Sequence, residues 1–198
     1  MKKNLPKMLT LLRRMLLLLA WMCMAALAVF YLYSYRGFVV DDMRFEREIC
    51  QAAQKYDLDP LLVRALIYEE SRFNPARVGN AGEIGLMQIM PSLAAADWAK
   101  ANKRKRPMRE MLFSPELNLD IGCWYLRDSL NKFKDYDHAL ELALARYNAG
   151  LSRARRWTPA EKKAPVLDNI TIPSTRKYVS NIMERSARYQ SEKNKEIL

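Results

Sequence analysis

The longest feature of the hydrophobic pattern lies near the N-terminus, where no residue from 15 to 35 carries a formal charge. At 1.5 Å of rise per residue, a helix of this length spans roughly 30 Å, which is the thickness of a bilayer's hydrocarbon core. Residues 15–35 are therefore predicted to form a transmembrane helix.

The flanks of this segment predict its orientation. Before it lie five cations and no acidic residue: Lys2, Lys3, Lys7, Arg13 and Arg14. Positively charged flanks stay in the cytoplasm, so the rest of the chain is expected outside it. Ala26 and Ala28 have the spacing of a signal-peptide cleavage site, which is the alternative. The apolar run continues past them to Tyr33 and Tyr35, which suit the membrane interface and favour an uncleaved signal anchor.

Beyond this segment, apolar positions recur at helical spacing. Asp41 or Asp42 is the expected N-cap of a helix that runs to about Tyr56. The pair Asp59 and Pro60 predicts the start of a buried helix that ends before residue 75, which is a proline. Glycines then mark a loop over residues 74–85.

The remaining helices follow from similar signals. We expect a short helix over residues 85–90, another from 91 to 98, and a basic loop over 100–109. Ser114 opens a helical region to residue 133, and Asp137 caps the next helix, which Gly150 closes. After a longer connection, Ser174 or Thr175 is expected to cap a final helix to about residue 190. No segment shows convincing two-residue alternation, so the predicted fold is all-α.

These patterns divide the chain into an anchor and one globular domain. The predicted parts are a basic cytoplasmic N-terminus (1–14), a transmembrane signal anchor (15–35), a tether (36–41), a helical domain (42–190) and a frayed tail (191–198). A chain of 198 residues that is 50% hydrophobic is long enough for one such core.

Charge limits the partners. The net charge is +11, and removing the five N-terminal cations leaves +6 for the exported part. This moderate excess suits a surface that stays near anionic lipids or wall polymers. Nucleic acid is a poor partner for an exported domain, so we expect none despite the basic loop.

Cysteine and histidine usage excludes several kinds of site. Cys23 lies in the membrane segment. A disulfide between Cys50 and Cys123 is permitted in an oxidising compartment, but the favoured interpretation is that both are buried small hydrophobes. His138 is the single histidine, so a multi-histidine zinc site cannot form, and a serine or cysteine nucleophile would depend on that residue alone. We expect no metal and no cofactor.

Two adjacent carboxylates carry the candidate chemistry. Glu69 and Glu70 end the apolar helix that begins at Pro60, where the helix dipole and their mutual repulsion disfavour ionisation. Successive helical residues point about 100° apart, so at most one faces a given cleft. Periodicity does not choose between them, and both could simply face water.

Several motifs decide the question by resemblance. They are Glu70-Ser71, the segment GLMQIMP from Gly85, LFSPELNLDIGCWYLRDSL from Leu112, ALARYNAG from Ala143 and IPSTRKYV from Ile172. In this order and spacing they resemble the Slt-type lytic transglycosylase domain of glycoside hydrolase family 23, which is related to goose-type lysozyme. The resemblance covers roughly residues 44–190 and implies a lysozyme-like helical fold.

The resemblance also assigns roles. It implies that Glu70 is the sole general acid and base, cleaving the β-1,4 bond between N-acetylmuramic acid and N-acetylglucosamine of peptidoglycan. The substrate's acetamido group assists, and the C6 hydroxyl closes a 1,6-anhydro ring, which makes the reaction a lyase reaction rather than a hydrolysis. The implied substrate-binding residues are Ser71, Met87, Gln88, Tyr147, Asn148 and Tyr178, with Tyr147 expected to orient the acid.

The sequence departs from the family pattern at two positions. Gly79 stands where a serine is common, so a hydrogen bond to the acid is either missing or supplied by Ser71. Ser174 stands where a glutamate is common before Thr175 and Arg176. Glu83 adds a carboxylate to the glycine-rich loop, where we expect a solvated surface position.

Three alternatives remain open at this stage. The first is a lysozyme-like muramidase that hydrolyses the same bond with water, and the second is a non-catalytic membrane-tethered scaffold that binds glycan. The third is an intracellular nucleic-acid binder, which requires that residues 15–35 do not insert in membranes. The favoured reading is a single-pass membrane enzyme with an extracytoplasmic domain, peptidoglycan as its substrate, and room for partners in cell-wall or secretion machinery.

Overall fold

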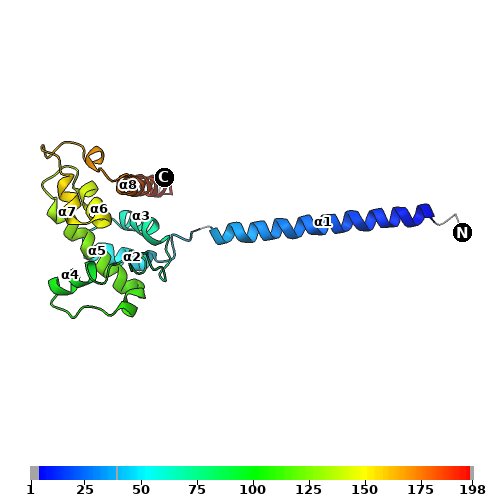
Figure 1. Ribbon diagram of the computed structural model, residues 1–198, viewed down its shortest axis with the longest axis horizontal. Coiled ribbons are helices and arrows are strands. Elements are labelled where there is room, and N and C mark those ends of the chain that lie inside the picture. The colour runs from blue at the N-terminus through cyan, green and yellow to red at the C-terminus, as the bar shows by residue number, and fades with distance from the viewer. Residues whose placement is uncertain (1–4, 39, 197–198) are drawn as a thin grey trace. The chain divides into compact units, whose positions relative to one another are not determined.

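The computed structural model describes residues 5–38 and 40–196. In these residues the regular secondary structure consists of eight α-helices and two 3-10 helices, and the only strand-like features are isolated bridges. The prediction of an all-α chain is confirmed. The chain divides into two compact units, Met1–Asp41 and Asp42–Leu198, each described by itself below (Figure 1).

The first unit consists of one long helix, α1 (Leu5–Phe38). Its segment Leu9–Tyr31 is long and apolar enough to cross a membrane, and its large apolar side chains are exposed. The helix extends beyond the predicted bounds 15–35 at both ends. The side chains of Tyr33 and Tyr35, expected at the membrane interface, lie outside the described part of the chain, as do Lys2 and Lys3.

The second unit begins with α2 (Glu46–Lys55) and α3 (Pro60–Ser71). Asp59 caps α3 as predicted, because its carboxylate accepts from the backbone N–H of Leu61 at 2.9 Å. The predicted capping of α2 by Asp41 or Asp42 is wrong, since α2 starts after Phe45 without a side-chain cap.

A loop without regular helix connects α3 to α4 (Ala94–Ala101). The prediction of a short helix over residues 85–90 is wrong. Gly85 has φ +80° and Gln88 has φ +48°, and these left-handed residues cannot continue an α-helix. Ile84 and Ile89 instead exchange two backbone hydrogen bonds, which close a tight turn that carries the motif.

The chain continues through η1 (Arg109–Phe113) into α5 (Pro115–Lys132), which Ser114 caps as predicted. Then follow α6 (Ala139–Ala149), α7 (Leu151–Arg156), η2 (Leu167–Asn169) and α8 (Pro173–Glu196). Gly150 ends α6 as predicted. The predicted cap Asp137 is wrong, because α6 starts after His138 without a side-chain cap.

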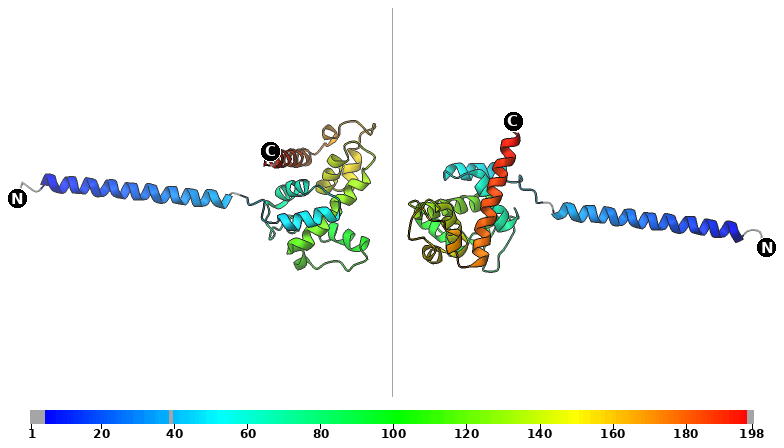
Figure 2. Two further views of the ribbon diagram at one scale, coloured as in Figure 1. Left: turned by 180° about the vertical axis from the view of Figure 1, so that it is seen from behind. Right: turned by 90° about the horizontal axis from the view of Figure 1, so that it is seen from above.

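The last helix also differs from expectation. Pro173 is the first residue of α8, so Ser174 and Thr175 lie inside the helix instead of capping it. The helix was predicted to end near residue 190 and to fray beyond it, yet it continues to Glu196. Figure 2 shows α8 crossing the domain as a single long rod.

The core of the second unit forms around α5, which packs against α2, α4 and α6, while α8 packs against α3 and α6. Fully buried side chains from these helices include Leu66, Leu119, Leu126, Leu142 and Leu144. All three cysteines are free. Cys123 is buried as expected, whereas Cys50 is exposed on α2, so the prediction that both are buried is wrong for Cys50.

Candidate active site

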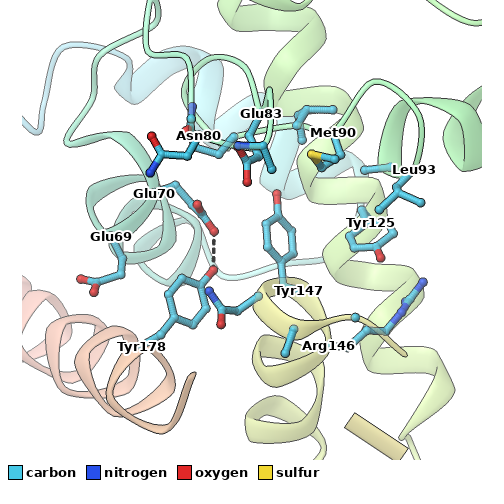
Figure 3. A pocket seen from close by; sticks show the side chains of 18 of the residues that line it. Glu69, Glu70, Asn80, Glu83, Met90, Leu93, Tyr125, Arg146, Tyr147 and Tyr178 are labelled. Carbon is cyan, nitrogen blue, oxygen red and sulfur yellow. Dashed lines mark hydrogen bonds between the residues drawn. The ribbon is translucent and has the colours of Figure 1, made fainter. Parts of the chain in front are cut away.

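A cleft of about 540 Å³ opens where the C-terminal end of α3 meets the segment 77–93, α6 and α8. Its walls combine the three motifs that lie far apart in the sequence: the glutamate pair, the segment that follows it, and the Tyr-Asn-Ala-Gly segment at the end of α6. Figure 3 shows these side chains converging from different elements.

The end of α3 resolves the ambiguity between the two glutamates. Both line the cleft, but their partners differ: Glu70 accepts from Tyr178, whereas Glu69 turns toward α8 (Figure 3), where its Oε1 accepts from Asn181 Nδ2 at 2.9 Å. Arg72, in the left-handed region with φ +52°, ends the helix directly after Ser71. The tertiary structure therefore gives the two carboxylates different surroundings.

Burial raises the pKa of Glu70 to about 7, because protein atoms exclude the water that would stabilise the charged carboxylate. The hydrogen bond from Tyr178 and the charge of Arg77 oppose this shift, while the negative charges of Glu83 and Glu69 add to it. A carboxyl group with such a pKa holds a proton at neutral pH about half of the time. It can therefore act both as an acid and as a base.

Tyr178 holds the acid in place. Its hydroxyl donates to Glu70 Oε1 at 2.5 Å. The pKa of Tyr178 lies well above its ordinary value, first because of burial and then because of the Glu70 charge, so the phenol stays protonated and remains a donor. The sequence named Tyr178 only as a substrate-binding candidate, and this contact makes it a partner of the acid.

Tyr147 and Asn148 line the cleft but bond elsewhere. The Tyr147 hydroxyl donates to the carbonyl oxygen of Met87 at 3.0 Å, and its role in orienting the acid stays a prediction. Asn148 Oδ1 accepts from the hydroxyl of Thr175 at 2.7 Å, which ties the end of α6 to the first turn of α8.

Gln88 is the third predicted residue on the cleft wall. Its side-chain N–H groups donate to the carbonyl oxygens of Gly85 at 2.9 Å and Arg77 at 3.2 Å. These two bonds hold the amide in place through its nitrogen, so the Gln88 Oε1 atom is available to accept a hydrogen bond from a ligand.

Two of the predicted substrate-binding residues do not line the cleft. The Ser71 side chain is buried, and its hydroxyl donates to the carbonyl oxygen of Ile67 at 3.4 Å. Ser71 therefore gives no hydrogen bond to the acid in place of a serine at position 79. Met87 is 0% exposed and packs over Gly122 of α5, so its side chain belongs to the core.

The cleft also contains residues that the sequence analysis did not select. Arg146 and Tyr125 line one end, with the guanidinium 4.5 Å from the ring centroid. Arg146 is 4% exposed and pairs with Asp128 at 2.7 Å. Its place beside Tyr147 in the ALARYNAG motif was the available signal. Glu83, expected to be a solvated surface residue, lies on the cleft wall as well.

In the part of the chain that the structure describes, no group of three or more His, Cys, Asp or Glu side chains is placed to hold a metal ion. The protonatable carboxyl group of Glu70 makes acid and base catalysis available to the cleft. Tyrosine, amide and guanidinium groups surround it and can bind polar ligands.

The family model for the transglycosylase SLT domain matches residues 47–168, more than half of the chain. This chain belongs to the SLT family. The resemblance drawn from the motifs is thereby confirmed, and the match includes the glutamate pair, the Gly-Leu-Met-Gln segment and the Tyr-Asn-Ala-Gly segment.

Among its relatives, this SLT-family chain is 31% identical over 144 residues to a membrane-bound lytic murein transglycosylase E of Buchnera aphidicola, covering 71% of the chain and 64% of the relative. It is 35% identical over 120 residues to a membrane-bound lytic murein transglycosylase C of Photorhabdus laumondii, covering 58% of the chain and 34% of the relative. The chain thus spans less than two thirds of either protein.

Solved structures agree on the fold. An inactive mutant of the lytic transglycosylase Slt from Pseudomonas aeruginosa superposes with a TM-score of 0.67 at 25% identity, covering 77% of this chain and 25% of that one. The 70 kDa soluble lytic transglycosylase from Escherichia coli gives a TM-score of 0.67 at 27% identity, covering 75% and 24%. The helical domain of this SLT-family chain therefore has the fold of lytic transglycosylases.

Proposed function

We propose that this chain is a peptidoglycan lytic transglycosylase that cleaves the β-1,4 bond between N-acetylmuramic acid and N-acetylglucosamine. One observation carries the proposal: Glu70 faces the cleft with a pKa raised to about 7, held by Tyr178. Membership of the SLT family and relatives described as lytic murein transglycosylases support the same reaction.

In the first step, the Glu70 carboxyl group donates its proton to the oxygen that links the two sugars. The bond between this oxygen and C1 of the muramic residue breaks, and the carbonyl oxygen of the neighbouring acetamido group bonds to C1. Because the substrate supplies this second group, the mechanism needs only one protein carboxylate, unlike the usual pair of glycosidases.

In the second step, the Glu70 carboxylate accepts the proton of the C6 hydroxyl. The freed oxygen attacks C1 and displaces the acetamido oxygen, which closes the 1,6-anhydro ring and returns Glu70 to its protonated form. A group that must give and then take a proton works best when its pKa is near the ambient pH, and burial of Glu70 supplies this condition.

The cleft walls suit a glycan strand. Gln88, Tyr147 and Asn148 present amide and hydroxyl groups, which can bind sugar hydroxyls and acetamido groups. Met90 and Leu93 add apolar surface at the other wall (Figure 3), and Leu93 is 57% exposed. Sugar rings carry apolar faces and polar edges, so this alternation of lining groups fits them.

We further propose how the chain is arranged at the membrane. Residues 1–14 lie in the cytoplasm, 15–35 cross the membrane, 36–41 form a tether, and the domain from residue 42 acts on the extracytoplasmic side. The basic N-terminal flank supports this orientation, and the relatives' description as membrane-bound supports the anchor. The anchor would hold the enzyme near its wall substrate.

Digestion of purified peptidoglycan tests the activity, with the products identified by mass spectrometry. The wild-type chain is expected to release anhydro-muropeptides, which are lighter by one water than hydrolysis products, and Glu70→Gln is expected to release none. Glu69→Gln is the matched control, because Glu69 lines the same cleft but bonds to Asn181 instead of Tyr178, and this variant should still release anhydro-muropeptides. Products with reducing ends would indicate a muramidase, and glycan binding without any release would indicate a scaffold. Either result contradicts the proposal.

A further inference from the structure

Glu83 is a carboxylate in the cleft that the mechanism above does not use. It comes from the glycine loop, residues 79–85, and lies on the side of the cleft opposite Tyr178 (Figure 3). Its Oε2 accepts from the backbone N–H of Ala81 at 3.0 Å. Among the described residues, no ion pair joins Glu83 to a cation.

Backbone bonds fix the loop that carries this carboxylate. Gly79 N–H donates to the Glu83 carbonyl oxygen at 2.8 Å, and Gly82 N–H donates to the Gly79 carbonyl oxygen at 3.1 Å. From outside the loop, Arg109 Nη1 donates to the carbonyl oxygen of Gly82 at 3.4 Å. The Glu83 side chain is therefore presented to the cleft by a closed turn rather than by a free loop.

Two acceptor oxygens pack against the same side of Gly79. A Cβ atom added to Gly79 would lie 2.3 Å from Glu83 Oε2 and 2.8 Å from Gln88 Oε1. The Gln88 amide cannot easily turn its N–H groups into this space, because both are used by backbone carbonyl oxygens. Because glycine has no side chain, both oxygens can lie this close to the backbone of residue 79.

We propose that Glu83 and Gln88 form an acceptor-only subsite beside Gly79 that binds a hydrogen-bond donor of the glycan strand. Both residues line the cleft, and their oxygens lie close together against Gly79, so a donor in the cleft can bond to both. The carboxylate makes the stronger of the two bonds. Such a donor is either a hydroxyl or acetamido N–H of the acetylated strand, or the ammonium group of a de-N-acetylated hexosamine. Glu83 is thus a specificity residue, and this inference rests on the proposed function.

Binding measurements on the full chain in detergent test the subsite, in the Glu70→Gln background so that the ligand is not cleaved. The probes are purified glycan strands of alternating N-acetylglucosamine and N-acetylmuramic acid, and the same strands after enzymatic de-N-acetylation. Loss of a hydrogen bond to a charged group typically costs enough to raise the Kd about tenfold, which is the effect expected for Glu83→Ala. Glu161→Gln, an exposed residue outside the cleft, is the control and should leave the Kd unchanged.

The two kinds of strand distinguish the donors. An equal loss of affinity on both strands identifies a hydroxyl donor. A loss on the acetylated strand alone identifies the acetamido N–H, and a larger loss on the de-N-acetylated strand identifies the ammonium group. An unchanged Kd for Glu83→Ala on both strands overturns the subsite. If the Glu70→Gln chain binds neither strand at all, the proposed function itself fails.

Gly79→Ala provides an independent variant. The backbone of Gly79 is not in the left-handed region, so alanine is compatible with it, but the new Cβ must displace the Glu83 carboxylate. The same Cβ would lie 2.8 Å from Gln88 Oε1, so Gly79→Ala is expected to raise the Kd at least as much as Glu83→Ala. The loss in the double variant should be smaller than the sum of the two single losses. Additive losses would contradict a shared subsite. In the active chain, Glu83→Ala should raise KM.

Discussion

Tyr178 donates its hydroxyl to Glu70 across 108 positions of sequence, and this 2.5 Å contact joins the final helix to the end of α3. A hydrogen bond to the charged form of a carboxyl group lowers its pKa. Tyr178 therefore works against burial, which by itself would raise the pKa of Glu70 further.

Removal of this donor should shift the pH profile. In Tyr178→Phe the carboxylate loses its hydrogen bond, so the pKa of Glu70 is expected to rise above about 7. The alkaline limb of kcat/KM, where the acid loses its proton, should move to higher pH. The profile is measured by release of anhydro-muropeptides between pH 5 and 9. A limb that stays in place or moves to lower pH would contradict this role of Tyr178.

Glu70 should also make stability depend on pH. Its pKa is about 7 in the folded protein against an ordinary value of 4.5, so the folded state binds more protons between these values. Stability from this group is full below about pH 4.5 and is lost as pH rises through about 7. The full loss is about 3 kcal/mol, because each pKa unit between 4.5 and about 7 is worth about 1.36 kcal/mol.

Thermal unfolding in detergent at pH 5 and pH 8 measures this effect. Glutamine does not ionise, so Glu70→Gln avoids the loss of stability that an ionised Glu70 causes at high pH. The stability of Glu70→Gln minus that of the wild type is therefore expected to be larger at pH 8 than at pH 5. The comparison of the two chains cancels the contributions of all other titrating groups. If the difference in stability between the two chains is the same at pH 5 and at pH 8, the pKa of Glu70 is not raised in the folded protein.

Arg146 should matter for stability more than its charge alone suggests. It is buried and pairs with Asp128 at 2.7 Å, with a further hydrogen bond to Ser129 Oγ at 2.8 Å. Asp128 is 27% exposed and keeps its contact with Lys132, so Arg146→Met is expected to cost about 1–3 kcal/mol, from the hydrogen bonds that the guanidinium loses, and to lower the Tm. Lys132, which pairs with the same Asp128 at the surface at 2.9 Å, is the control. Lys132→Met should cost less than about 1 kcal/mol.

Met87 is expected to act through packing. Its side chain is fully buried and contacts Gly122, so Met87→Ala should lower the free energy of unfolding by about 2–5 kcal/mol. Met90, which is only partly buried and lines the cleft, is the control. Met90→Ala should change glycan affinity more than stability. Stability is measured by denaturant unfolding and affinity by glycan binding. If Met87→Ala changes glycan affinity more than Met90→Ala does, and destabilises the fold less, then Met87 lines the cleft instead of the core.

Several elements could be predicted because their signals are local. Asp59 and Ser114 each precede a proline and cap the helix that follows, as their order in the sequence indicates. The apolar helix α1 could be predicted from the long uncharged run, because length and hydrophobicity are properties of a contiguous segment.

The predictions that failed concern side chains with distant partners. Asp42 was expected to cap a helix, yet it accepts from Arg64 at 3.0 Å and from Tyr189 at 2.8 Å. Thr175 was expected to cap α8, yet its hydroxyl donates to Asn148. Local patterns cannot anticipate such competition, because the competing partners lie far away in the sequence.

The sequence by itself determined the helical class, the apolar N-terminal segment and, through its motifs, the family. It could not choose between Glu69 and Glu70 by periodicity, since neighbouring helical residues differ only in direction. The tertiary structure made that choice by bringing α8 and the glycine loop to one end of α3. It also placed Met87 in the core and Glu83 in the cleft, because burial depends on what packs against a residue and not on the residue alone.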